Sequence, residues 1–264
     1  MQLSTEQLTQ FQKNGFIILR NVLDIARCEA MLKVAKEHLE EKIEPIETEV
    51  GYDSRDKEYR TSVTDYTSNI NNDEDYIIVR RLRQVYDRSP LFKAWMEDVE
   101  LRPVLKQVLD DEVVLITAHH NSIMTKMPYY SRSTRWHQDG RYWQYSDNNL
   151  VSVWLALDSE TSKNGVLEFI PSSHKMEFIP EQFDEKEYFS EDYHANKKIL
   201  AQKVSTGLQK GDVVIFHSLL LHRANKNSTD TPKISFVYTV KGLKTEAVKG
   251  SRSANFQEKP LLNL

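Results

Sequence analysis

The chain has 264 residues, a net charge of −4 and 28% charged residues, with lysine and arginine dispersed along it. A chain of this length can bury a sizeable core. The dispersed positive charge argues against a nucleic-acid-binding surface, and no apolar stretch approaches the roughly 20 residues that would span a membrane. The one cysteine, Cys28, excludes an intramolecular disulfide and fits a reducing compartment, so we expect a cytoplasmic protein.

The first 40 residues predict two helices around a short strand. Ser4 and Gln7 form a capping-box pattern ahead of a helix that should end near Gly15, and residues 16–19 then predict a brief strand. Asp24 is a candidate N-cap for a second, amphipathic helix. Its apolar residues fall on one stripe, made of Ile25, Cys28, Leu32, Ala35 and Leu39. Cys28 is therefore expected to be a core residue.

Residues 45–75 are polar and show no sustained periodicity. A long irregular segment inside a domain is often a functional loop, so we expect a flap or lid near the binding pocket. Two Pro-initiated helices should follow, one after Ser89 and one from Arg102 to about Leu109.

The pattern changes to strands at about residue 112. Short runs rich in β-branched and apolar residues are separated by Gly, Pro, Asn and Asp, as in antiparallel β proteins. The expected strands cover residues 113–117, 121–124, 150–157, 166–170, 213–216 and 234–240. Their number and spacing predict a mainly β fold with helical flanks and a jelly-roll-like core. We expect one domain over 1–264, with helical support and a lid in 1–110, the core in 111–241 and a tail in 242–264.

His137 and Asp139, in the segment Trp136-His-Gln-Asp-Gly140, are the strongest chemical signal. Alternate residues of a strand point the same way, so both side chains could reach one metal ion. A second histidine would complete the facial triad of non-haem Fe(II) oxygenases, which leaves coordination positions open. Two candidates for it, His217 and His222, follow a later apolar run. Because they are five residues apart, they face opposite sides of an extended strand, and only one of them can serve this ion. His119 and His120 are adjacent, so at most one of that pair is expected to point inward.

Several ordered motifs give this chain a family resemblance. Trp136-His-Gln-Asp-Gly140, Asn164-Gly165 before Phe169-Ile-Pro-Ser-Ser-His174, and the run from Gly211 to His222 resemble the phytanoyl-CoA dioxygenase family. The resemblance begins near residue 5 and extends to residue 241. It implies a double-stranded β-helix (cupin-like) core and an enzyme that uses Fe(II), 2-oxoglutarate and O₂. It also implies that His137, Asp139 and His222 are the iron ligands.

The same resemblance assigns residues to the cosubstrate. The family usually has an arginine eleven residues after the last ligand histidine, where it pairs with the far carboxylate of 2-oxoglutarate. Lys233 stands at that position here and keeps the positive charge but loses the two-pronged geometry of arginine. Ser235 and Trp154 match the accompanying hydroxyl and pocket aromatic, and Asn121 is a further match for an amide that contacts the cosubstrate. A plain core residue is the alternative interpretation of Trp154.

The resemblance implies hydroxylation of an unactivated C–H bond of a small molecule, with release of succinate and CO₂. Related halogenases have a small residue in place of the carboxylate, so Asp139 favours hydroxylation, desaturation or ring closure over chlorination. Arg141, Tyr142 and Trp143 are candidates to bind an anionic or zwitterionic substrate. A solvated arginine beside core aromatic residues is the alternative interpretation of these three positions.

Two other classes of protein could use the same fold. A cupin-type metal enzyme that does not use 2-oxoglutarate would need the metal ligands but not Lys233 and Ser235. A non-catalytic jelly-roll binding module would need none of these residues. The sequence predicts no oligomeric state and no particular substrate.

Overall fold

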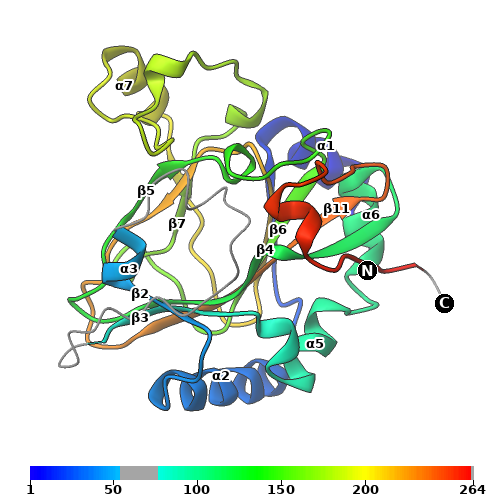
Figure 1. Cartoon of the computed structure of the whole chain (residues 1–264), viewed down its shortest axis with the longest axis vertical. Coiled ribbons are helices and arrows are strands. Elements are labelled where there is room, and N and C mark those ends of the chain that lie inside the picture. Colours follow the sequence, from blue (N-terminus) through cyan, green and yellow to red (C-terminus); the bar gives the residue numbers. More distant parts are fainter. Residues whose placement is uncertain (54–76, 263–264) are drawn as a thin grey trace.

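Two antiparallel sheets face each other in the computed structural model, which describes residues 1–53 and 77–262 (Figure 1). The larger sheet has the order β1-β9-β6-β11-β4-β3-β2, with β12 paired to β4, and the smaller has the order β5-β10-β7-β8. This arrangement confirms the predicted mainly β fold with a double-stranded β-helix core. The strands are β1 (Phe16–Leu19), β2 (Ile46–Thr48), β3 (Val79–Arg83), β4 (Val113–Lys126), β5 (Thr134–His137), β6 (Leu150–Ala156), β7 (Leu167–Phe169), β8 (Val204–Ser205), β9 (Val213–His217), β10 (His222–Ala224), β11 (Lys233–Gly242) and β12 (Lys259–Pro260).

The described helices are α1 (Thr5–Asn14), α2 (Ile25–Glu40), α3 (Glu49–Asp53), α5 (Pro90–Met96), α6 (Arg102–Leu109) and α7 (His194–Leu200), with the 3₁₀ turns η1 (Val85–Asp87), η2 (Asp139–Arg141), η3 (Ser173–Lys175), η4 (Pro180–Gln182) and η5 (Arg252–Asn255). Helices α1, α2, α5 and α6 pack on the outer face of the larger sheet, whereas α7 lies away from it (Figure 1). The Ser4–Gln7 capping box and the Asp24 and Ser89 N-caps are present as predicted. Within the described residues, no helix combines the length and apolar character needed to cross a membrane.

Strand β6 shows how the sheet separates two environments. Val151, Val153 and Leu155 pack into the core between the sheet and the helices, whereas Trp154 and Ala156 pack between the two sheets. This alternation confirms the predicted faces of the strand and places one row of β6 side chains in the interior where the two sheets meet.

The first 110 residues contain more strand than their sequence predicts. β2 and β3 add two strands to the edge of the larger sheet, so residues 46–53 are a strand and a short helix rather than irregular chain. Glu47 and Glu49 bring polar side chains into that edge, and their buried ion pairs with arginines replace the apolar pattern by which strands are recognised. The remainder of the expected lid, residues 54–75, lies outside the described residues.

Two further expectations need correction. Residues 113–126 form one long strand, β4, whereas the sequence predicted two strands separated by polar residues. Ile25 was placed on the buried stripe of its helix, but it is 52% exposed because α2 buries Met31 beside Cys28, Leu32 and Ala35. Cys28 is fully buried as predicted.

Gly211 lies in a tight approach between the start of β9 and the chain before α2. Its carbonyl accepts hydrogen bonds from the backbone N–H groups of Val22 and Leu23, and its φ of +87° lies in the left-handed region. A Cβ here would fall against the Leu23 carbonyl oxygen, closer than real Cβ atoms come. Gly207 has a φ of +52° with no atom within 4 Å of an added Cβ.

We therefore expect Gly211→Ala to lower the free energy of unfolding by about 3 kcal/mol or more, because left-handed strain and a backbone clash add together. Gly207→Ala has only the left-handed strain and should cost about 1 kcal/mol. Urea unfolding of both variants measures the difference. Equal losses would show that the approach of Leu23 does not constrain this turn.

Candidate metal centre

Three side chains converge where the ends of β5 and β10 meet. His137 ends β5, His222 begins β10, and the two residues lie directly opposite each other in the pairing of these strands. Asp139 follows β5 at the start of η2. One donor atom from each of His137, Asp139 and His222 lies within 4.8 Å of the other two. The structure thus brings together the three residues that the sequence selected as metal ligands.

Backbone hydrogen bonds fix which nitrogen of each imidazole faces the group. His137 Nδ1 lies 2.8 Å from the carbonyl oxygen of Arg135, and His222 Nδ1 lies 2.9 Å from that of Leu220. A carbonyl oxygen can only accept, so both Nδ1 atoms carry the proton and donate it. Each Nε2 then presents its lone pair toward Asp139, the orientation that a metal-binding histidine requires.

Asp139 is a buried carboxylate held by two donors. His120 Nε2 lies 3.0 Å from its Oδ2, and the Ser152 hydroxyl donates to the same oxygen over 3.3 Å. Burial acts to raise the pKa of Asp139, but His120 and His222 nearby and the hydrogen bonds it accepts hold that pKa well below its usual range. Burial and the neighbouring His137 lower the pKa of His222 to about 3. At neutral pH the site thus has an ionised carboxylate and a neutral His222, which are the protonation states that a metal ion needs.

The distances between these atoms fit a cation. His137 Nε2 is 3.5 Å from Asp139 Oδ1, and His222 Nε2 is 3.7 Å from Oδ2. Each Nδ1 faces a backbone carbonyl, so in the neutral imidazoles the Nε2 lone pairs face the carboxylate. A divalent ion among them would be bound by all three. Two imidazoles and one carboxylate are the donor set of the non-haem Fe(II) facial triad.

The centre opens into a cavity between the two sheets. Tyr142, Trp143 and Trp154 form part of its wall, while Asp139 is the one acidic residue among the described residues that line it. Cations line the cavity in larger number: Arg80, Arg81, Arg83, Lys126, Arg223, Lys233 and Arg252. Carboxylates pair with many of these cations from behind, namely Glu47, Glu49, Glu160 and Glu168.

The predicted cosubstrate anchor is already occupied by a carboxylate of the protein. Lys233 Nζ is 3.1 Å from Glu160 Oε2, and Ser235 Oγ and Trp154 Nε1 donate to Glu160 Oε1 over 2.6 and 2.9 Å. Glu160 and Ser235 are fully buried, and Lys233 is nearly so. The three residues do converge as the sequence predicted, but they converge on Glu160. The residues of the triad fit an iron ion. The predicted anchor for 2-oxoglutarate does not fit as well, because the ammonium of Lys233 is already paired with Glu160.

The other predicted binding residues divide into two groups. Tyr142 and Trp143 line the cavity. Arg141 pairs with Glu187 and lies over the ring of Phe183, and the Asn121 side-chain oxygen accepts a hydrogen bond from the backbone N–H of Tyr86. Neither Arg141 nor Asn121 is among the described residues that line the cavity.

His119 and His120 both line the cavity, against the expectation that at most one could. The pairing of β4 with β11 skips four residues at this point, since Asn121 pairs with Tyr238 and Ile116 with Thr239. This bulge breaks the alternation on which the expectation rested. His119 stacks on Trp143 with ring centroids 4.9 Å apart, while His120 reaches Asp139.

His217, the alternative metal ligand, lies outside the centre. Its Nδ1 accepts a hydrogen bond from the Leu219 N–H, and its ring packs 5.2 Å from that of His174. The structure therefore favours His222, which faces His137 across the strand pair.

We expect His222→Gln to weaken Fe(II) binding by about 100-fold or more, because it removes one of three ligands and outer contacts alone are worth about 10- to 100-fold. His217→Gln is the matched control and should stay within about threefold of the wild type. Anaerobic titration calorimetry with Fe(II) measures both. Equal affinities in the two variants would remove His222 from the ligand set.

His120 is expected to position Asp139, so His120→Phe should weaken Fe(II) binding by about 10- to 100-fold. His120→Gln keeps a donor and should recover most of that loss. His119→Phe retains a ring to stack on Trp143 and serves as the neighbouring control. If His120→Gln binds as weakly as His120→Phe, the hydrogen bond to Asp139 does not support the centre.

Comparisons with known proteins agree with this geometry. Residues 11–235 match the family model described as "Phytanoyl-CoA dioxygenase (PhyH)". The chain is 24% identical to peroxisomal phytanoyl-CoA dioxygenase of Homo sapiens over 238 residues, covering 86% of this chain and 65% of that protein. The chain thus spans about 65% of the length of that curated relative.

Two solved structures show the same fold. The carbocyclase SnoK from nogalamycin biosynthesis superposes with a TM-score of 0.70 at 17% identity, covering 99% of this chain and 94% of that one. EctD from S. alaskensis with 2-oxoglutarate and 5-hydroxyectoine gives 0.69 at 19%, covering 93% and 78%. Since the family model covers most of the sequence, including the converging triad, the chain belongs to the phytanoyl-CoA dioxygenase (PhyH) family.

Proposed function

We propose that the protein is an Fe(II)- and 2-oxoglutarate-dependent dioxygenase that hydroxylates an unactivated C–H bond of a small molecule. The observation that carries this proposal is the convergence of His137, His222 and the Asp139 carboxylate, with the Nδ1 of each imidazole turned to a backbone carbonyl. The family membership supports it, as does the shared fold of EctD, whose structure contains 2-oxoglutarate and 5-hydroxyectoine. When bound, Fe(II) with 2-oxoglutarate and O₂ would supply the oxidising chemistry and release succinate and CO₂.

The protein residues have three tasks in this reaction. The carbonyls of Arg135 and Leu220 hold the two imidazoles in the tautomer that binds metal. His120 and Ser152 hold Asp139 in its ionised form, which keeps a ligand position filled and favours hydroxylation over chlorination. Leu167 and Phe216 give the cavity an apolar wall, which would help a bound substrate to displace water beside the reacting centre.

The substrate is proposed to be an anionic or zwitterionic small molecule. Among the described residues that line the cavity, seven are cationic and one, Asp139, is acidic. Four glutamates behind the wall pair with five of the seven, and the excess of cations over carboxylates that remains favours an anion. Tyr142 and Trp143 remain candidates to contact it, because both face the cavity. Arg141 is a weaker candidate than the sequence suggested, since Glu187 already holds its guanidinium. A cytoplasmic location stays a prediction.

Aerobic incubation with Fe(II) and 2-oxoglutarate should release succinate, and candidate anionic metabolites should accelerate it. We expect Asp139→Asn to lower succinate formation by about 100-fold or more, since the amide is a poor replacement for a charged ligand. Asp158→Asn makes the same change at an exposed position and should leave the rate within about twofold. Succinate can be quantified by mass spectrometry.

Two results would contradict the proposal. Iron-loaded wild-type protein that never forms succinate would favour a cupin-type metal enzyme that does not use 2-oxoglutarate. Failure to bind Fe(II) at all would favour a non-catalytic binding module, because such a module has no use for the triad.

A further inference from the structure

Glu160 behaves as a built-in carboxylate ligand for the cosubstrate anchor. Its two oxygens receive the ammonium of Lys233, the hydroxyl of Ser235 and the indole N–H of Trp154. It is fully buried, so water does not screen its charge. A second carboxylate entering this pocket would face Glu160 across a single ammonium. Lys233 is therefore a poor partner for the far end of 2-oxoglutarate.

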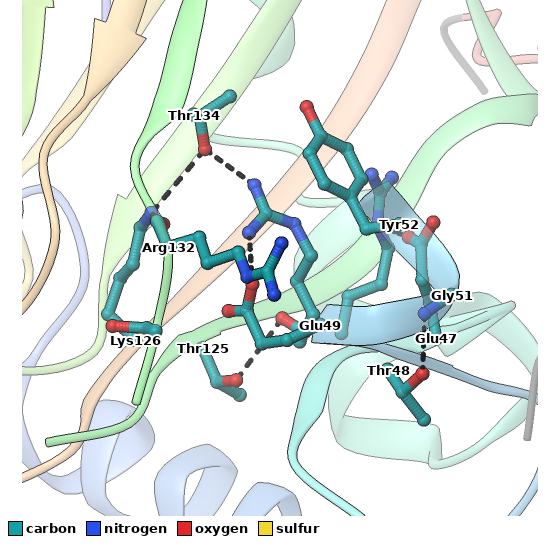
Figure 2. Close-up of polar contacts among 12 residues, drawn as sticks. Glu47, Thr48, Glu49, Gly51, Tyr52, Thr125, Lys126, Arg132 and Thr134 are labelled. Carbon is teal, nitrogen blue, oxygen red and sulfur yellow. Dashed lines mark hydrogen bonds and ion pairs between the residues drawn. The ribbon is translucent and has the colours of Figure 1, made fainter. Parts of the chain in front are cut away.

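A second lysine stands directly opposite Lys233. Lys126 ends β4 and pairs with Lys233 in the register of β4 and β11, so the two side chains share the face that lines the cavity. Directly opposed like charges destabilise a sheet unless an anion compensates them. Glu160 compensates one of the two. The other ammonium, on Lys126, donates to the carbonyl oxygen of Arg132 and reaches the Thr134 hydroxyl at 3.5 Å, both of which are neutral (Figure 2).

The neighbouring Arg80 adds a third positive charge, and its own contacts are already made. Arg80 donates to Glu49 over 2.8 Å and to Thr134 over 2.7 Å, and all but 1% of its surface is buried. Among the described residues, the three buried cations Lys126, Lys233 and Arg80 therefore have two carboxylates in direct contact, Glu160 and Glu49, while the charge of Glu47 also acts on Arg80. Among the residues that the structure describes, the ammonium of Lys126 has no carboxylate within ion-pair distance. Burial, Arg80 and Lys233 lower the pKa of Lys126 well below its usual value, although the charge of Glu49 acts in the opposite direction.

Lys126 also lies at a suitable place relative to the metal ligands. Thr134 and His137 are three residues apart on β5, about 10 Å along an extended strand. They nevertheless share the inward face, because β5 bulges between them: His137 pairs with His222 and Thr134 with Ala224, only two residues further on. The Thr134 hydroxyl thus lies between the metal ligands and the Lys126 ammonium along the inward face of β5. A five-carbon dicarboxylate bound to the metal at one end can extend along this face.

We propose that Lys126, supported by Thr134 and Arg80, binds the far carboxylate of 2-oxoglutarate, and that Glu160 keeps Lys233 out of this role. This inference rests on the proposed function, since it assigns a residue to that cosubstrate. In this arrangement Lys233 forms an internal ion pair with Glu160, and Lys126 on the adjacent strand binds the cosubstrate in its place.

Anaerobic binding of 2-oxoglutarate to the Fe(II)-loaded protein tests the inference without turnover. The visible charge-transfer band of the chelate gives the dissociation constant. Lys126→Met should raise that constant at least tenfold for 2-oxoglutarate and leave it within about twofold for 2-oxopentanoate, which has the same carbon chain but no far carboxylate. The matched control is the double variant Lys233→Met with Glu160→Gln, which removes the internal pair as a unit and should stay within about threefold for both acids.

The opposite pattern overturns the inference: normal 2-oxoglutarate binding in Lys126→Met together with a tenfold loss in the double variant would identify Lys233 as the anchor. Should Lys126→Met fail to fold, Lys126→Gln carries the same expectation and keeps polar contact with Thr134. Failure of the proposed function gives a different result. In that case wild-type protein binds Fe(II) but shows no band at any 2-oxoglutarate concentration, and the assignment of Lys126 falls with it.

Discussion

The centre depends on one constraint, which is that the lone pairs of two imidazole nitrogens and a carboxylate must face one another closely enough to share one cation. Hydrogen bonds from the Nδ1 atoms of His137 and His222 to backbone carbonyls impose this arrangement, and the pairing of β5 with β10 brings the two rings together. Such a group of lone pairs is unfavourable when buried alone and favourable around a cation. The fold therefore prepares the charge and geometry of the site before any ion is bound.

Buried charges are also paired along the wall of the cavity. Carboxylates behind the wall, including Glu47 and Glu49, pair with arginines whose other atoms reach the cavity, so the positive lining does not require fully uncompensated buried charge. Buried ion pairs of this kind are costly to form and strongly destabilising to break on one side only. They explain why β2 and β3, at the edge of the larger sheet, carry charged rather than apolar residues on the inner face.

Local patterns in the sequence predicted the parts of the fold that local physics determines. The Ser4 capping box, the alternation along β6 and the His137–Asp139 spacing each depend on neighbouring residues, and the structure contains all three. The bounds of the strands were harder to predict, because the bulge in the 14-residue strand β4 coincides with a polar stretch that looks like a break between two strands. The role of Glu160 could not be found this way, since its partners Lys233 and Ser235 are more than 70 residues away in sequence.

Lysine at position 233 and glutamate at position 160 are best understood as one feature. A buried glutamate without Lys233 would be an uncompensated charge, and Lys233 without Glu160 would add to the repulsion from Lys126 directly opposite it. The compact ammonium also leaves room for Ser235 and Trp154 to donate to the same carboxylate, whereas a guanidinium would present a broad planar fork to it. The departure from the usual arginine is thus coupled to a rearrangement of charge among β11, the segment after β6 and the end of β4. In the proposed arrangement, the cation that remains for an incoming carboxylate is Lys126 on β4 rather than Lys233 on β11.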